Sequence, residues 1–199
     1  MNDSLDAIGA IRNVAFVGPF DDENGIGYDT AYGPELDLDL SRPHDGLRGE
    51  VRWRVVEGLG RTGTIALHEA LRPTSEVVVY ALAVLEAPAA TAATLYLGTP
   101  GATKAWLNAE PILADPDHHP ARFDQTALSV HLRRGENVLL LKMASGTAGP
   151  LLLHARVVDA DGRPIRGLRV KAPTAGRFAA PRSIPAGKAI RGARPLVDR

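Results

Sequence analysis

The sequence contains no cysteine, which excludes disulfide bonds and thiolate metal sites. Aromatic residues are scarce, at 5% of 199 residues, although surfaces that bind single-stranded nucleic acid usually carry stacked rings, as do many carbohydrate sites. There is also no excess of charge, because 23 basic side chains balance 23 acidic ones. A nucleic-acid binder needs a basic excess to neutralise phosphates, so we expect no nucleic-acid partner.

Long apolar runs are missing as well. No stretch of about 18 apolar residues is present, so no membrane span is expected. The first residues, 1–6, are acidic and lack the basic and apolar regions of a secretory signal. The compartment stays open, as does the question whether the chain is a piece of a larger protein.

What is present is an apolar fraction of 45%, enough for a core, in short segments of period two. Turn residues separate these segments, and almost no helical pattern occurs. The strand candidates are residues 13–17, 36–40, 50–56, 76–86, 91–97, the hairpin 104–113, 127–132, 138–143 and 151–159, with 65–71 left open between helix and strand. This pattern predicts an all-β fold, a two-sheet antiparallel jelly-roll β-sandwich.

Two pairings follow from the order of these strands. The run 76–86 is almost wholly apolar and predicts a long central strand, with 91–97 as its partner after a turn. The residues 134–137 form a turn between 127–132 and 138–143, which predicts a hairpin there.

The C-terminal part has a different composition. Residues 171–199 carry seven basic side chains and one acidic one, with frequent Pro and Gly, so the rest of the chain is acidic. We predict a lead-in over 1–12, the sandwich over 13–170 and an extended tail or linker over 171–199. Such a basic tail can fold back on the acidic body, dock on an acidic partner, lead to another domain or remain solvated.

An ordered series of short motifs suggests a family. The series is Phe16–Phe20, Gly27–Glu35, Val51–Arg54, Val79–Ala81, Leu97-Gly98, Ala105–Asn108, Arg134–Asn137, Leu140–Met143 and Val158–Pro164. Over about residues 13–168 the chain resembles the galactose-binding-like β-sandwich modules that accompany bacterial glycosidases and other large multidomain bacterial proteins. This resemblance implies a non-catalytic accessory module with ligand contacts in the loops at one edge of the sandwich.

The chain departs from the usual pattern of these modules at two turns. They usually place Asp-Gly before the Trp strand and Asn-Gly at its turn, whereas this chain has Thr99–Ala102 and Asn108-Ala109. Trp53 and Trp106 could serve as sugar platforms, but both lie in alternating strands, which favours core packing. Asn108 is expected at a turn position with positive φ.

The long polar loops 18–35 and 114–124 are the best candidates for a binding surface. Ring and polar side chains there predict ligand contacts, and hard oxygen donors predict a structural calcium as the one possible cofactor. The ligand candidates are Tyr28, Asp29, Tyr32, His118 and Phe123, and the metal candidates are Asp21, Glu23 and Asn24. If these loops bind a glycan, some of Tyr28, Tyr32 and Phe123 should be exposed around one concavity.

No catalytic motif is recognisable. The sequence has neither Gly-x-Ser-x-Gly nor a Gly-x-Gly-x-x-Gly after a strand, and four of its six histidines are scattered while His118 and His119 are adjacent. We therefore expect no enzyme. Two functions remain: a non-catalytic module that binds a glycan, or a structural or protein-interaction domain of a larger assembly without a sugar site.

Overall fold

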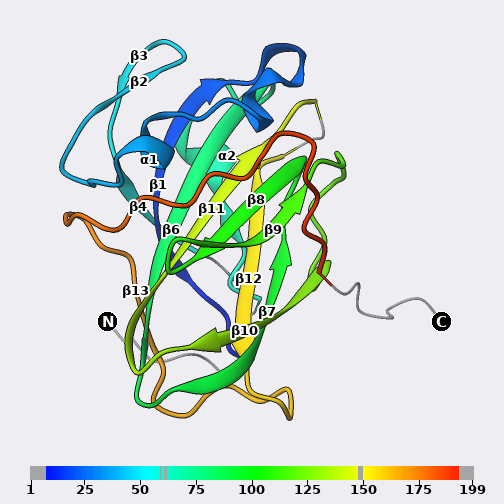
Figure 1. Ribbon diagram of the computed structural model, residues 1–199. Helices are drawn as coiled ribbons and strands as arrows, with labels where there is room; N and C mark the ends of the chain where they lie inside the picture. Colours follow the sequence, from blue (N-terminus) through cyan, green and yellow to red (C-terminus); the bar gives the residue numbers. More distant parts are fainter. Residues whose placement is uncertain (1–7, 59, 61, 148–149, 193–199) are drawn as a thin grey trace.

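The computed structural model describes residues 8–58, 60, 62–147 and 150–192 (Figure 1). The strands are β1 (Asn13–Asp21), β2 (His44–Gly46), β3 (Gly49–Val51), β4 (Arg54–Glu57), β5 (Ile65–Ala66), β6 (Val77–Ala87), β7 (Thr91–Gly98), β8 (Ala102–Leu107), β9 (Glu110–Asp115), β10 (Thr126–Leu132), β11 (Gly135–Ala144), β12 (Leu152–Val158) and β13 (Arg169–Lys171). The short helices are η1 (Glu23–Tyr28), α1 (Gly33–Leu36) and α2 (Leu67–Ala70). No helix in the described part of the chain has the length and hydropathy needed to cross a bilayer.

Two antiparallel sheets form the sandwich. The large sheet has the order β4-β1-β6-β11-β8-β9, with β13 also pairing β6, and the small sheet has the order β10-β7-β12-β5. Strands β2 and β3 form a separate hairpin beside the large sheet (Figure 1). The prediction of an all-β antiparallel sandwich is confirmed.

Strand β6 shows why its sequence is an unbroken apolar run. Val79 and Ala81 face the inner core, the cluster between the two sheets. Tyr80 and Leu82 face the outer core, a second cluster on the far side of the large sheet that includes Trp106. Because both faces of the strand are buried, no position along it can be polar without a partner.

Two predicted pairings are wrong. Residues 91–97 form β7, which pairs β10 and β12 in the small sheet and not β6. Likewise β11 begins at Gly135 and pairs β6 and β8, so residues 133–134 connect the two sheets and no hairpin forms there. In both cases a period-two strand can bury its apolar face from either sheet, and the sequence pattern does not choose between them.

Two strand predictions are also revised, and the segment left open between helix and strand is resolved. Residues 36–40 are no sheet strand: α1 ends at Leu36, and Leu38 and Leu40 then bury their side chains in the outer core without a sheet neighbour. Segment 50–56 is broken between β3 and β4, where Trp53 turns into the outer core. Segment 65–71 contains both a short strand, β5, and a short helix, α2. The hairpin 104–113 is confirmed as β8 and β9, and φ of Asn108 is 54° as predicted for its turn.

The two ends of the described chain pack on the sandwich. Residues 1–7 of the predicted lead-in lie outside the described residues, but Ile11 is fully buried and donates a hydrogen bond to the Ala155 carbonyl at 2.8 Å. At the other end, residues 172–192, here called the strap, cross the outer face of the large sheet (orange to red in Figure 1). Residues 172–192 therefore pack on the sandwich and do not form a solvated tail.

The strap is held mainly by backbone hydrogen bonds. Leu40 donates to the Gly176 carbonyl at 2.9 Å, and the Trp106 indole donates to the Arg182 carbonyl at 2.9 Å. Further along, Ala114 and Ile190 exchange two bonds of 2.8 and 3.0 Å. Three ion pairs of 3.0 to 3.2 Å join strap arginines to the body: Arg177–Asp37, Arg182–Glu110 and Arg191–Asp117. The described part of the basic tail thus docks on acidic groups of its own sandwich.

Candidate functional site

The loop predicted to bind a ligand folds down onto the outer face of the large sheet. Asp22 is fully buried at its start, and its two carboxylate oxygens accept from the Gly27 and Gly146 amides at 3.0 and 3.1 Å. Gly27 has no room for a side chain, since a Cβ there would lie 2.5 Å from the Asp21 carbonyl. This segment is consequently fixed by its own sequence against the sheet.

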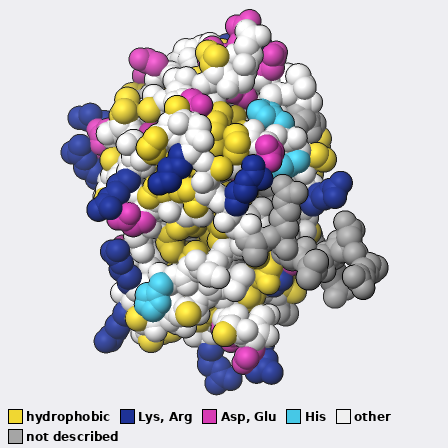
Figure 2. Space-filling view, turned by 45° about the vertical axis from the view of Figure 1, so that its right-hand side comes forward, with side chains coloured by type: hydrophobic (Ala, Val, Ile, Leu, Met, Phe, Trp, Pro, Cys, Tyr) yellow, Lys and Arg dark blue, Asp and Glu magenta, His cyan; other side chains and the backbone are white. Residues whose placement is uncertain are grey.

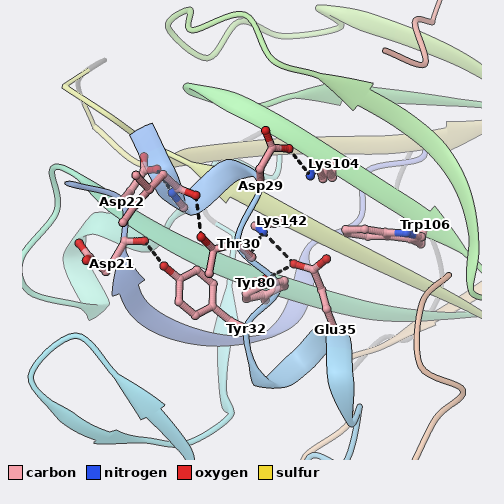
Figure 3. Close-up of polar contacts among 12 residues, drawn as sticks. Asp21, Asp22, Asp29, Thr30, Tyr32, Glu35, Tyr80, Lys104, Trp106 and Lys142 are labelled. Atoms are coloured by element: carbon pink, nitrogen blue, oxygen red, sulfur yellow. Dashed lines mark hydrogen bonds and ion pairs between the residues drawn. The ribbon is translucent and has the colours of Figure 1, made fainter. Parts of the chain in front are cut away.

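Beneath the loop lies a buried lysine (Figure 3). Lys142, on β11, is fully buried; its ammonium lies 2.8 Å from Glu35 and donates to the Thr30 carbonyl at 2.6 Å. The Tyr80 hydroxyl donates to the same Glu35 oxygen at 2.5 Å. Burial lowers the pKa of Lys142, opposed by the charge of Glu35, and burial followed by Glu35 raises the pKa of Tyr80. The three side chains form a closed network.

A second lysine repeats the arrangement next to the first. Lys104 lies directly opposite Lys142 in the register of β8 and β11, and its ammonium is 3.1 Å from Asp29 (Figure 3). It also lies 4.2 Å from the ring centre of Tyr28, a cation–π contact. The pKa of Tyr28 is raised, first by burial and then by Asp29. Two adjacent cations on the sheet are therefore neutralised by two acids from one loop.

The predicted ligand residues do not meet at one surface. Tyr28 is 9% exposed, and Asp29 pairs with Lys104. The Tyr32 hydroxyl donates to the Asp21 carbonyl at 2.5 Å. Phe123 is 42% exposed but lies beside the small sheet, with its ring centre 5.9 Å from that of His154 on β12. Tyr28, Tyr32 and Phe123 are therefore not exposed together around one concavity, because Tyr28 and Tyr32 pack against the sheet, and a glycan site in these loops gains no support.

The predicted metal residues are also engaged locally. The Asp21 carboxylate accepts from the Glu23 amide at 2.9 Å, and Asn24 adopts a left-handed φ of 57° in the turn. Within the described residues no group of three or more His, Asp or Glu side chains is placed to hold a metal ion. The calcium site expected from Asp21, Glu23 and Asn24 gains no support from this geometry.

The two candidate loops do come together at one end of the sandwich. A pocket of about 520 Å³ lies between them, and its lining includes Asp22, Glu76, His118 and His119. His118, alone among the predicted ligand residues, faces this pocket. Among the described residues that line this pocket, no side chain carries an aromatic ring other than the two imidazoles.

A larger hollow, the outer-face groove, lies where the strap leaves the large sheet. Its volume is about 790 Å³. Its lining is Asn13, Val55, Glu57, Val84, Glu136 and Phe178 together with residues 170–175. Val55 is 45% exposed, so its apolar side chain is accessible within the groove. The groove combines an apolar floor, one ring and several polar groups.

Sequence reasoning missed these features for identifiable reasons. Lys104 and Lys142 interrupt otherwise apolar strands, a signal that each needs a buried acid, but the sequence does not say which one. The groove could not be predicted, since it depends on how Phe178 of the strap approaches Val55 of β4.

Comparison with known proteins adds little to this geometry. No protein-family model and no curated protein matches the chain. Among solved structures it is similar to an anti-sigma factor domain-containing protein from Clostridium clariflavum, with a TM-score of 0.39 and 10% sequence identity. The match covers 84% of this chain and 44% of that one, so this chain spans less than half of its length. At this TM-score the similarity carries no argument about function.

Proposed function

We propose that this chain is a non-catalytic binding module that holds a short glycan segment in the outer-face groove. The observation that carries the proposal is the composition of the groove. Val55 and Val84 form an apolar floor, and the Phe178 ring lies beside them. A pyranose presents an apolar C–H face and a rim of hydroxyls, which such a surface complements.

The rim of the groove supplies partners for hydroxyl groups. In the described part of the chain the Glu57 and Glu136 carboxylates are exposed and take part in no ion pair or side-chain hydrogen bond. Asn13 adds an amide. A volume of about 790 Å³ falls within the usual range of ligand sites, about 300 to 1,000 Å³.

The placement of the two carboxylates favours binding without hydrolysis. Glu57 lies on β4 and Glu136 on β11, and three strand spacings separate these strands. Three spacings amount to about 14 Å, whereas glycosidases hold their carboxyl pair about 5 to 9.5 Å apart. This separation suits a groove that binds a saccharide without hydrolysing it.

A glycan array followed by calorimetry on retained oligosaccharides tests the proposal. We expect Phe178→Ala and Glu57→Gln each to weaken binding about tenfold, as loss of one ring or charged contact does. The matched controls are Phe123→Ala, an exposed ring beside the small sheet, and Glu69→Gln, an exposed acid outside the groove.

Glu57→Gln keeps the strap contacts, so it separates loss of the site from loss of folding. The proposal would be overturned if the array retained no glycan, or if the control variants lost as much affinity as Phe178→Ala and Glu57→Gln. The protein-interaction alternative would then be preferred. Shortened oligosaccharide products after incubation with the protein would overturn the non-catalytic part.

A further inference from the structure

A third hollow, here called the arginine crevice, lies at the edge of the sandwich beside β4. Its volume is about 410 Å³. It is lined by Gly18, Pro19, Glu50, Val51, Arg52, Arg54, Ala70, Leu71 and Arg72. Three arginines from two separate segments of the chain thus line one small space.

The charge in this crevice is not balanced. Glu50 is its only acidic residue, and that carboxylate already lies 2.8 Å from Arg52. In the described part of the chain Arg54 and Arg72 have no carboxylate partner, and both bind backbone carbonyls instead. The crevice therefore carries two uncompensated cations, in a body whose sequence outside residues 171–199 is acidic.

The two unpaired guanidiniums are held in place before any ligand arrives. Arg54 donates from Nη2 to the Ala70 carbonyl at 2.9 Å, and its guanidinium carbon lies 4.8 Å from the ring centre of buried Phe16. Arg72 donates from Nη1 to the Leu71 carbonyl at 2.6 Å and also to the carbonyl of His68. Fixing these side chains in advance reduces the entropy that a ligand must overcome.

Most donors of these two side chains remain unused. A guanidinium carries five N–H donors in a planar fork, and each of the two arginines uses a single nitrogen on the backbone. Planar forks match the oxygens of phosphate and sulfate in a bidentate fashion, which a lysine cannot do.

We infer that the arginine crevice binds a tetrahedral oxyanion, a phosphate or sulfate group, through Arg54 and Arg72 with Arg52 in support. This site is independent of the glycan proposal, because the crevice and the outer-face groove share no lining residue. The same chemistry is presented by free inorganic phosphate and by a phosphate or sulfate ester on a sugar.

The first measurement is calorimetric titration of the full chain with inorganic phosphate at low ionic strength, where screening is weak. We expect saturable binding with a Kd of about 1 mM or tighter. The double variant R54Q/R72Q should bind at least about tenfold more weakly. The matched control R133Q/R134Q removes two exposed arginines from the turn before β11 and should bind within about twofold of wild type.

A gain-of-binding variant guards against misfolding as an explanation. Glu50→Gln frees the Arg52 guanidinium and should tighten phosphate binding roughly two- to fivefold. Glucose 6-phosphate and glucose 6-sulfate, titrated in parallel, separate the sources: tighter binding of an ester assigns the site to a modified sugar, and tighter binding of phosphate assigns it to the free ion. Non-saturable binding, equal loss in both double variants, or weaker binding by Glu50→Gln would overturn the inference.

Discussion

At the residue scale, Lys142 is the most consequential side chain of the outer core. It is fully buried in a strand whose neighbours are apolar, and the Glu35 carboxylate neutralises its charge. Removing one partner of a buried ion pair leaves the other charge uncompensated, which costs more than the pair contributes. The loop that carries Glu35 and the strand that carries Lys142 are consequently coupled.

We predict that Lys142→Met lowers the free energy of unfolding by about 3 to 5 kcal/mol. Replacing both charges, in K142M/E35L, should be less harmful than this single change because no buried charge is left without a partner. Urea unfolding of Lys142→Met, Glu35→Leu and the double variant measures the coupling energy between the two side chains. A loss below about 0.5 kcal/mol for Lys142→Met would contradict the role given to the pair.

Three buried or partly buried tyrosines should make the free energy of unfolding decrease at alkaline pH. The pKa values of Tyr28, Tyr32 and Tyr80 are raised in the folded protein, in each case first by burial. Above about pH 10 the unfolded chain releases phenolic protons that the folded chain keeps, so stability falls as the pH rises. The lowered pKa of Lys142 acts in the opposite direction but involves one group.

Urea midpoints should therefore decrease between about pH 9.5 and pH 11. The Tyr28 hydroxyl is buried and has no hydrogen-bond partner in the described part of the chain, so Tyr28→Phe should cost little at pH 7. The same variant should show a shallower alkaline decrease. A steeper decrease in Tyr28→Phe would oppose this account.

At the element scale, the β8–β9 hairpin turns through two residues with positive φ, Asn108 at 54° and Ala109 at 68°. Asn108 fits this conformation, and its side-chain oxygen accepts from the Val138 amide at 3.0 Å. Ala109 does not fit, because a Cβ in the left-handed region costs about 1 to 2 kcal/mol. The replacement of the usual Asn-Gly by Asn-Ala thus leaves strain in this turn.

Ala109→Gly should raise the free energy of unfolding by about 0.5 to 1 kcal/mol, after allowing for the greater entropy of glycine in the unfolded chain. Ala90→Gly is the control, since Ala90 is exposed in a turn without positive φ and should gain nothing from glycine. Thermal unfolding of both variants tests this prediction. Equal changes in Tm for Ala109→Gly and Ala90→Gly would argue against strain at Ala109.

The period-two pattern predicts which segments are strands, but it does not predict which strands pair. The pattern of residues 91–97 correctly predicts a strand with one buried face, but β7 buries that face from the small sheet. Residues 36–40 also alternate correctly, yet within the described residues Leu38 and Leu40 form backbone hydrogen bonds with the strap and not with a sheet strand. Alternation reports burial of a face, while pairing depends on segments that are distant in sequence.

At the scale of the whole molecule, the strap closes the outer face of the large sheet. Phe178 and Ile184 pack against the outer core, and the Trp106 indole is satisfied by a strap carbonyl. On the face drawn in Figure 2, basic side chains are dispersed among acidic and apolar ones and form no continuous stripe. Three basic residues of the strap, Arg177, Arg182 and Arg191, instead form ion pairs within the molecule.

A chain ending at Lys171 should lose about 2 to 3 kcal/mol of stability, or roughly 5 to 10 °C in Tm, because Phe178 and Ile184 no longer cover the outer core. Its tryptophan emission should shift to longer wavelength as Trp106 becomes accessible to water. A chain ending at Gly192 removes only residues beyond the described strap and should resemble wild type. Identical Tm values for the two truncated chains would show that the strap adds no stability.

The sequence by itself determined the all-β class, the central strand 76–86 and the hairpin around Asn108, because each depends on local periodicity or turn chemistry. It also identified two loops that meet at one end of the sandwich, and it predicted Trp106 as a core residue. Only the tertiary structure decided which acid neutralises each buried lysine, which sheet each strand joins and where the strap docks. These features depend on contacts between residues far apart in the chain, and local periodicity does not identify which distant segment a residue will contact.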